Sequence, residues 1–195
     1  MVCQGLVFLG KNVRVHARPG YGRVVLGRFL HLGDGCRIYS HEGTVRIGAK
    51  SVLGREVTIT SYLDIDIGDS CLLADWTYVT DFDHELTDIS RPIKDQGLAK
   101  TPVRISSDCW LGVRTTVLRG SRIGAGTVVG AHSVVRGSLP DLAVAVGVPA
   151  RVVKDRRALH EAEQDRREYL AGLARGNAEQ AAQAASRSSE SERPE

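Results

Sequence analysis

The chain has few aromatic residues and almost no methionine. Only 5% of its 195 residues are Phe, Trp or Tyr, and a single Met is present. A core filled mainly by large aromatic rings is therefore excluded, although 42% of the residues are hydrophobic. The core must be built from aliphatic side chains, each of which contributes roughly 1.5–3 kcal/mol when it is fully buried.

Long apolar runs, a strong net charge and paired cysteines are also missing. No segment is long and apolar enough to span a bilayer, and residues 1–10 lack the basic start and cleavage site of a signal peptide. We therefore expect no membrane insertion and a cytoplasmic location. The formal net charge of +3 does not point to nucleic acid. The four cysteines contain no C-x-x-C pair, which argues against a zinc site and suits a reducing compartment.

An aliphatic residue recurs at every sixth position through much of the chain. Glycine often follows it, where a side chain would hinder a tight turn. A fixed period of this length is typical of a solenoid made of stacked coils. The repeating positions are Leu26, Leu32, Ile38; Ile47, Leu53, Ile59; Ile67, Leu73, Val79; and Ile105, Leu111, Val117, Ile123, Val129, Val135.

Three such hexapeptides predict one triangular coil of about eighteen residues, with the aliphatic side chains pointing inward. The fourth residue after each aliphatic position is usually small, as a tight corner of the prism requires. The small residues in this register are Cys36, Ser51, Cys71, Thr77, Cys109, Thr115, Ser121, Thr127 and Ser133. The fold class predicted is thus mainly β, a parallel β-helix of hexapeptide repeats.

The repeat also predicts how the chain is divided. We expect a β-helix domain over residues 1–155, of which the first 25 carry only a weak repeat. The repeat is interrupted after Val79, which predicts a loop over residues 81–100 that leaves the stack, and such loops often carry function. A charged helix is expected over residues 156–176 and a disordered tail over residues 177–195.

His84 is the histidine in the predicted loop. A neutral imidazole can accept a proton from a hydroxyl or amine near neutral pH, and Asp81, Asp83 and Glu85 beside it could orient the ring. A solvated histidine in an acidic surface loop explains the position equally well. His132, at an outward position of a coil, is far from His84 in sequence, which argues against a zinc ion held between subunits.

Three further residues could serve a ligand. Trp110 lies on the outside of the predicted prism, where it must contact a neighbouring subunit, the extruded loop or a ligand, and packing under the loop is the ordinary alternative. Arg151 and Lys154 close the prism and could bind phosphate groups. A solvated basic edge explains these two residues as well.

Together these residues resemble the hexapeptide-repeat acyltransferases, and especially the maltose and galactoside O-acetyltransferases. The resemblance covers about residues 47–154. It rests on Ile67-Gly68-Asp69 leading to His84, on ISSDCWLG at 105–112, on the repeat at 123–135 and on GVPAR at 147–151. It implies a left-handed β-helix, an exception to right-handed crossovers, and a homotrimer with active sites between adjacent prisms.

The resemblance also implies an acyltransferase that carries an acyl group, expected to be acetyl, from acyl coenzyme A directly to a hydroxyl of a sugar or polysaccharide precursor. His84 would be the general base, with backbone N–H groups stabilising the oxyanion and no metal. Asp64, Tyr78 and Asp81 are expected near the acceptor. The residues expected to contact the coenzyme are Trp110, Val113, Ala131, Arg136, Gly137, Arg151 and Lys154.

The sequence departs from the family pattern at three positions. Val113 replaces a small or hydroxyl residue, Phe82 replaces the first histidine of an Asp-His-x-His motif, and His132 replaces Gly or Asn. The acceptor could instead be an antibiotic or an amino sugar, acylated on nitrogen or oxygen. A non-catalytic β-helix scaffold and a metal-dependent hydratase are the alternatives from other classes.

Overall fold

The computed structural model describes the backbone of residues 1–191 and the side chains of residues 1–175. The chain divides into two compact units, Met1–Asp155 and the residues from Arg156 onward. The first unit contains the described strands, and the second contains helix α1 (Arg156–Ser191).

The first unit is a three-sided prism of parallel sheets. Sheet A contains, in spatial order, β1 (Val2–Cys3), β4 (Gly22–Leu26), β7 (Gly43–Ile47), β10 (Asp64–Ile67), β15 (Val103–Ile105), β18 (Arg122–Ile123) and β21 (Ser138–Leu139). Sheet B contains β2 (Val7–Leu9), β5 (Leu30–Leu32), β8 (Val52–Leu53), β11 (Leu72–Leu73), β16 (Trp110–Leu111), β19 (Val128–Val129), β22 (Ala143–Gly147) and β23 (Ala150–Asp155). Sheet C contains β3 (Arg14–Ala17), β6 (Arg37–Ser40), β9 (Thr58–Ser61), β12 (Tyr78–Thr80), β17 (Thr116–Val117) and β20 (Val134–Val135).

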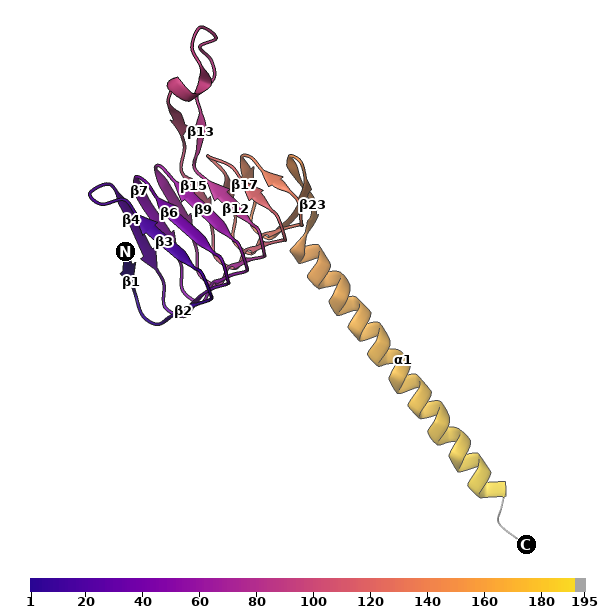
Figure 1. Cartoon of the computed structure of the whole chain (residues 1–195). Coiled ribbons are helices and arrows are strands. Elements are labelled where there is room, and N and C mark those ends of the chain that lie inside the picture. The colour runs from indigo at the N-terminus through magenta and orange to yellow at the C-terminus, as the bar shows by residue number, and fades with distance from the viewer. Residues whose placement is uncertain (192–195) are drawn as a thin grey trace. The chain divides into compact units, whose positions relative to one another are not determined.

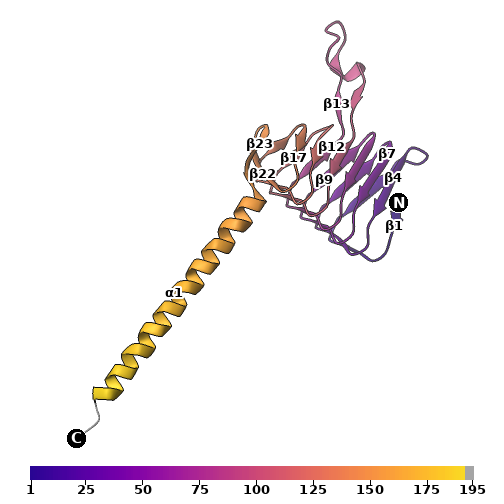
Figure 2. The ribbon, with the colours of Figure 1, turned by 180° about the vertical axis from the view of Figure 1, so that it is seen from behind.

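The chain visits sheets A, B and C in turn, so that each circuit adds one coil to the stack (Figure 1). Six coils are complete, and β21 and β22 begin a seventh. The antiparallel pairing of β22 with β23 ends the prism. Seen from behind, the same coils lie side by side along the stack (Figure 2). The predicted prism of hexapeptide coils is therefore confirmed.

The repeating aliphatic residues form the core, as the period predicted. None of the fifteen is more than 3% exposed. They pair across neighbouring coils at equal height, as Ile67 does with Ile105 in sheet A and Leu73 with Leu111 in sheet B. Continuous aliphatic columns therefore fill the narrow interior, which explains how a chain poor in aromatic residues folds.

The small corner residues are buried, and they also connect the coils. The thiol of Cys71 donates to the carbonyl of Ser106 at 3.1 Å, and the hydroxyl of Thr127 donates to the carbonyl of Pro140 at 2.6 Å. Burial raises the pKa of the Cys36 thiol to about 11, and this thiol donates to the carbonyl of Gly54 at 3.0 Å. The corner position therefore requires a small side chain that can donate a hydrogen bond, since an unpaired buried carbonyl is costly.

The interruption of the repeat forms a hairpin rather than an irregular loop. β13 (Phe82–His84) pairs antiparallel with β14 (Leu98–Lys100), and a short 3-10 helix, η1 (Ile93–Asp95), lies between them. The hairpin projects from the prism where the chain passes from sheet C to sheet A, between the fourth and fifth coils (Figure 1). We call this edge of the prism the C–A corner. The expected extrusion is confirmed, and its strands give the protruding segment a defined shape.

Helix α1 extends beyond the segment that the sequence predicted. The expected end was residue 176, whereas the backbone is helical to Ser191. The last residues of the expected disordered tail, 192–195, lie outside the described residues, and disorder of the tail stays a prediction. In the described part of the chain, no helix is long and apolar enough to cross a membrane.

Candidate active site

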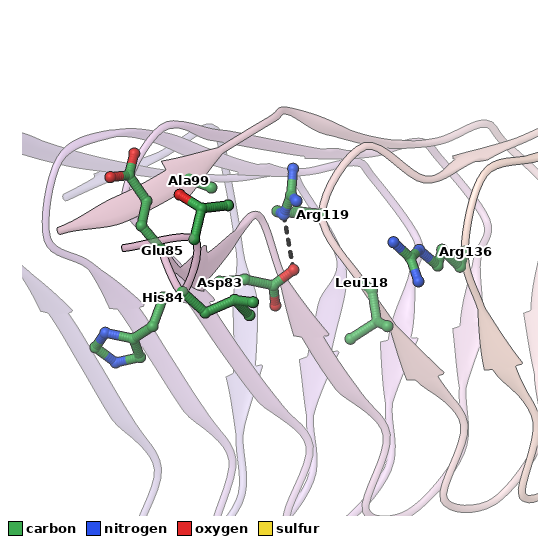
Figure 3. Close-up of a pocket in the computed structure, with 9 residues that line it drawn as sticks. Asp83, His84, Glu85, Ala99, Leu118, Arg119 and Arg136 are labelled. Carbon is green, nitrogen blue, oxygen red and sulfur yellow. Dashed lines mark hydrogen bonds and ion pairs between the residues drawn. The ribbon is translucent and has the colours of Figure 1, made fainter. Parts of the chain in front are cut away.

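His84 lies beside an open pocket of about 860 Å³ on the C-terminal side of the hairpin. Besides His84 and Asp83 of β13, Leu118 and Arg119 contribute from the fifth coil and Arg136 from the sixth. These side chains come from segments far apart in sequence, because every coil passes the C–A corner once. Figure 3 shows Arg119 and Arg136 along one side of this pocket.

A second pocket, of about 440 Å³, lies on the N-terminal side of the hairpin and also includes His84. Its walls include His41, which follows β6, Tyr62, which follows β9, and Phe82 of β13. His84 is thus shared by a pocket with arginine side chains and a pocket with aromatic rings. A single imidazole at this junction can meet ligands from both sides.

An ion pair holds the base of the hairpin against the fifth coil. Nε of Arg119 lies 2.7 Å from Oδ2 of Asp83 (Figure 3). Nη1 of Arg119 also lies 3.3 Å from Oγ1 of Thr101. Arg136 has no ion-pair partner within the described residues and is exposed. Arg136 is therefore the cation in this pocket that is available to an anionic ligand.

The acids expected to orient His84 do not do so in the protomer. Asp83 is engaged by Arg119 and Asp81 is buried elsewhere. The imidazole of His84 points away from both Asp83 and the carboxylate of Glu85 (Figure 3). Within the part of the chain that the structure describes, this imidazole has no hydrogen-bonded partner. An orienting group for His84 must come from a ligand or from another protomer.

Asp81 has a structural position at the root of the hairpin. It is fully buried, and its oxygens accept hydrogen bonds from Oγ of Ser61 (2.6 Å) and from the backbone N–H groups of Tyr62 (2.8 Å) and Leu63 (2.9 Å). Its carbonyl accepts the N–H of Thr101 at 2.9 Å. Asp81, expected from the sequence to lie near the acceptor, thus ties the hairpin to the third coil and does not line either pocket of His84.

The other residues expected near the acceptor lie outside the two pockets of His84. Asp64 is in β10 of sheet A, where its Oδ1 accepts the N–H of Thr44 at 2.9 Å. Tyr78 points outward from β12 of sheet C and is 37% exposed. The sequence patterns did not indicate that His41 and Tyr62 line a pocket beside His84. The spacing of His41, Tyr62 and Phe82, one coil apart, is the signal that could have revealed them.

The residues expected to contact the coenzyme lie at several separate places on one prism. Arg136 and Gly137 lie at the C–A corner, after β20. Trp110 is half exposed on sheet B, and Val113 and Ala131 are exposed at the corner that follows this sheet. Arg151 and Lys154 are exposed on β23, at the end of sheet B. Of these seven residues, Arg136 alone lines the pocket of His84.

No cluster of three or more potential metal ligands occurs among the residues described. The two pockets at the C–A corner are lined by histidine, arginine and aromatic side chains.

Comparison with known proteins gives relatives over most of the chain, although no protein-family model matches. The Mycobacterium tuberculosis protein Rv3034c, named as an acetyltransferase, is 53% identical over 171 residues, which are 88% of this chain and 57% of the relative. The chain therefore spans just over half the length of this relative. The Escherichia coli protein WbbJ, whose name assigns it to O-acetyl transfer in lipopolysaccharide biosynthesis, is 33% identical over 74% of this chain and 80% of its own length.

A hexapeptide-repeat acetyltransferase of Vibrio cholerae, solved in complex with acetyl coenzyme A, has a similar fold. The TM-score is 0.59 at 28% identity, over 69% of this chain and 71% of the other. The left-handed β-helix expected from the sequence is thereby confirmed. The first unit consists of hexapeptide coils, and the match to WbbJ covers four fifths of that protein. The chain therefore belongs to the hexapeptide-repeat acetyltransferase family.

Proposed function

We propose that this protein transfers an acyl group, in the first instance acetyl, from acyl coenzyme A to a hydroxyl of a sugar or polysaccharide precursor. The observation that carries the proposal is the position of His84 between a pocket with a free arginine and a pocket with aromatic walls. The name of the lipopolysaccharide relative and the acetyl coenzyme A bound to the Vibrio protein support this choice of acceptor and donor.

The reaction needs one base and no covalent intermediate. The imidazole of His84 accepts the proton of the acceptor hydroxyl while the hydroxyl oxygen attacks the thioester carbonyl carbon. The tetrahedral intermediate collapses when the carbon–sulfur bond breaks, and the proton passes from His84 to the departing coenzyme thiolate. The products are the acyl ester and free coenzyme A, so atoms and charge balance. Backbone N–H groups near the thioester stabilise the oxyanion.

The coenzyme lies on the C-terminal side of His84 in this proposal. Arg136 borders the pocket there, and Arg151 and Lys154 are further exposed cations on β23, at the end of sheet B. Guanidinium groups suit phosphate oxygens. Trp110, Val113 and Ala131 face a different side of the same prism, so they can reach the coenzyme of a neighbouring protomer more easily than their own.

An apolar column along sheet B supports a homotrimer with such shared sites. The column occupies one outward position on successive strands of sheet B and contains Phe8, Val52, Leu72 and Trp110, each between 39% and 50% exposed. The exposed His31 lies between Phe8 and Val52. In sheet A, by contrast, three neighbouring outward residues are charged, and Asp66 pairs with Arg46 at 3.0 Å and with Arg104 at 3.1 Å. A contiguous exposed apolar column on one side marks an interface.

We expect a charge in the sheet B column to prevent assembly. Leu72→Arg places a guanidinium where the interface is apolar, and an unpaired buried charge is costly. The variant should be a monomer by light scattering after gel filtration, and transfer should fall at least tenfold because half of each cleft is missing. Ile89→Arg, the same kind of change at a fully exposed hairpin position, is the matched control and should stay trimeric. A trimeric Leu72→Arg protein would contradict this interface.

The activity itself is tested by mass spectrometry of reactions with acetyl coenzyme A and a panel of neutral sugars, amino sugars and oligosaccharides. We expect acetyl esters, which mild base removes, on a sugar hydroxyl. Acetylation confined to amines, as a base-stable amide, would replace the hydroxyl acceptor by the amino-sugar alternative. Calorimetry without any binding of coenzyme A would instead favour a non-catalytic scaffold.

A further inference from the structure

Four aromatic rings form a continuous row at the C–A corner on the N-terminal side of His84. Ring centroids lie 6.3 Å apart for Tyr39 and His41, 4.5 Å for His41 and Tyr62, and 4.7 Å for Tyr62 and Phe82. His41 and Tyr62 are nearly parallel, at 15°, whereas Phe82 meets Tyr62 edge-on at 70°. We call this row the aromatic platform.

The aromatic platform is half-buried, and three of its four rings line the 440 Å³ pocket that contains His84. Its rings come from the second coil, the third coil and the hairpin, so they cross three levels of the stack. Neighbouring strands in a sheet are about 4.8 Å apart, so three levels extend over about 10 Å. A single sugar ring does not cover this length.

Polar groups border the aromatic platform. Lys100 lies over the Tyr62 ring, with Nζ 5.6 Å from its centroid, and forms an ion pair with Glu42. The hydrogen bond from Lys100 holds the pKa of the Glu42 carboxyl below its usual range, and this carboxylate can accept hydrogen bonds from hydroxyl groups. Thr60 adds a hydroxyl to the wall of the pocket. Aromatic walls with a few polar groups at the edge are typical of small-molecule sites.

We infer that the aromatic platform binds the acceptor, and that the acceptor is a saccharide of at least two linked pyranose rings. Because His41 and Tyr62 stack face to face, the aromatic platform offers a ligand an apolar strip of ring edges. The face of C–H groups on a pyranose can pack against this strip, and its rim of hydroxyls suits Glu42, Lys100 and Thr60. The terminal ring presents its hydroxyl to His84, and the next ring packs against the edges of Tyr62 and His41. This inference rests on the proposed function, because it names the substrate class of that same site.

A purely structural role for the aromatic platform makes a different prediction. If Tyr62 only supported the base of the hairpin, its loss would lower kcat for every acceptor equally, because His84 would be misplaced. If Tyr62 binds the second sugar ring, its loss would raise KM for longer acceptors and leave kcat nearly unchanged. Chain-length dependence therefore separates the two roles.

The experiment compares monosaccharides with their di- and trisaccharides, glucose with maltose and maltotriose and galactose with lactose among them, as acceptors for acetyl coenzyme A. For wild-type protein we expect kcat/KM to rise about tenfold from one ring to two. Tyr62→Ala should remove this rise through KM, whereas Tyr62→Phe, which keeps the ring, should retain it. Tyr169→Ala, on exposed α1, is the matched control and should behave as wild type.

The outcomes distinguish the inference from the function on which it rests. Equal kcat/KM for one and two rings, with Tyr62→Ala unchanged in KM, overturns the aromatic platform while leaving O-acyl transfer intact. Absence of transfer to every saccharide, with coenzyme still bound, overturns the sugar acceptor and the aromatic platform together. A fall of kcat alone in Tyr62→Ala assigns Tyr62 to hairpin support and also overturns the inference.

Discussion

Replacing His84 by alanine is expected to lower kcat for acyl transfer by about 10²–10⁴, the usual contribution of a general base. The imidazole is exposed at the junction of two pockets, and it has no hydrogen bond within the described protomer that its loss would break. The variant should therefore retain the melting temperature, the molecular mass in solution and the coenzyme A dissociation constant of wild type. Steady-state kinetics together with calorimetry would measure the two effects separately.

The control for this prediction is His160→Ala, on α1, where the ring contacts only Gln164 at 3.3 Å among the described residues. It should leave kcat within twofold of wild type. Turnover in His84→Ala that matches the control would rule out His84 as the base. Loss of coenzyme binding in His84→Ala would instead mean that the residue binds the donor.

Asp81→Asn is expected to be the most destabilising of the conservative changes near the site. Both oxygens of Asp81 accept hydrogen bonds, from one hydroxyl and two backbone N–H groups, so the amide nitrogen of asparagine must face a donor in either orientation. Because bonds to a buried carboxylate are strong and unpaired buried groups are costly, we expect a loss on the order of 3 kcal/mol in the free energy of unfolding. Urea denaturation would measure it.

The matched control is Asp83→Asn, two residues further along the chain, in β13. Asp83 is about half exposed and pairs with Arg119, and such surface ion pairs contribute about 0–1 kcal/mol. If Asp81 contacted the acceptor, as the sequence suggested, Asp81→Asn would instead keep the stability of wild type and raise the KM of the acceptor. Equal stability of the two variants would thus contradict the anchoring role.

The fold was predictable because a period of six has one common structural solution. The unbroken series from Ile105 to Val135 requires that every sixth side chain be equivalent, and only a stack of equal coils satisfies this requirement. The break after Val79 predicted where a segment leaves the stack. The small corner residues were identified by position, but their hydrogen bonds to the next coil became apparent only in the structure.

The candidate site was only partly predictable, because the sequence does not state which side of a prism a residue faces. His84 and Arg136 share a pocket, whereas Trp110, which belongs to the same family pattern, lies on another sheet. Tyr62 and His41 were missed because each appears in isolation along the sequence, and their stacking arises from the closure of one coil over the next.

The hairpin leaves the prism and returns to it at the same point, since the carbonyl of Asp81 accepts the N–H of Thr101. The stacking of the coils on either side is therefore independent of how many residues the excursion contains. Relatives could exchange the outer part of this hairpin, residues 88–97, for a segment of another length or sequence without disturbing the coils or the hairpin residues that line the larger pocket. Evolution, or an engineer, could thus vary residues such as Lys94 and Gly97, which line the smaller pocket, while the stack of coils stays unchanged.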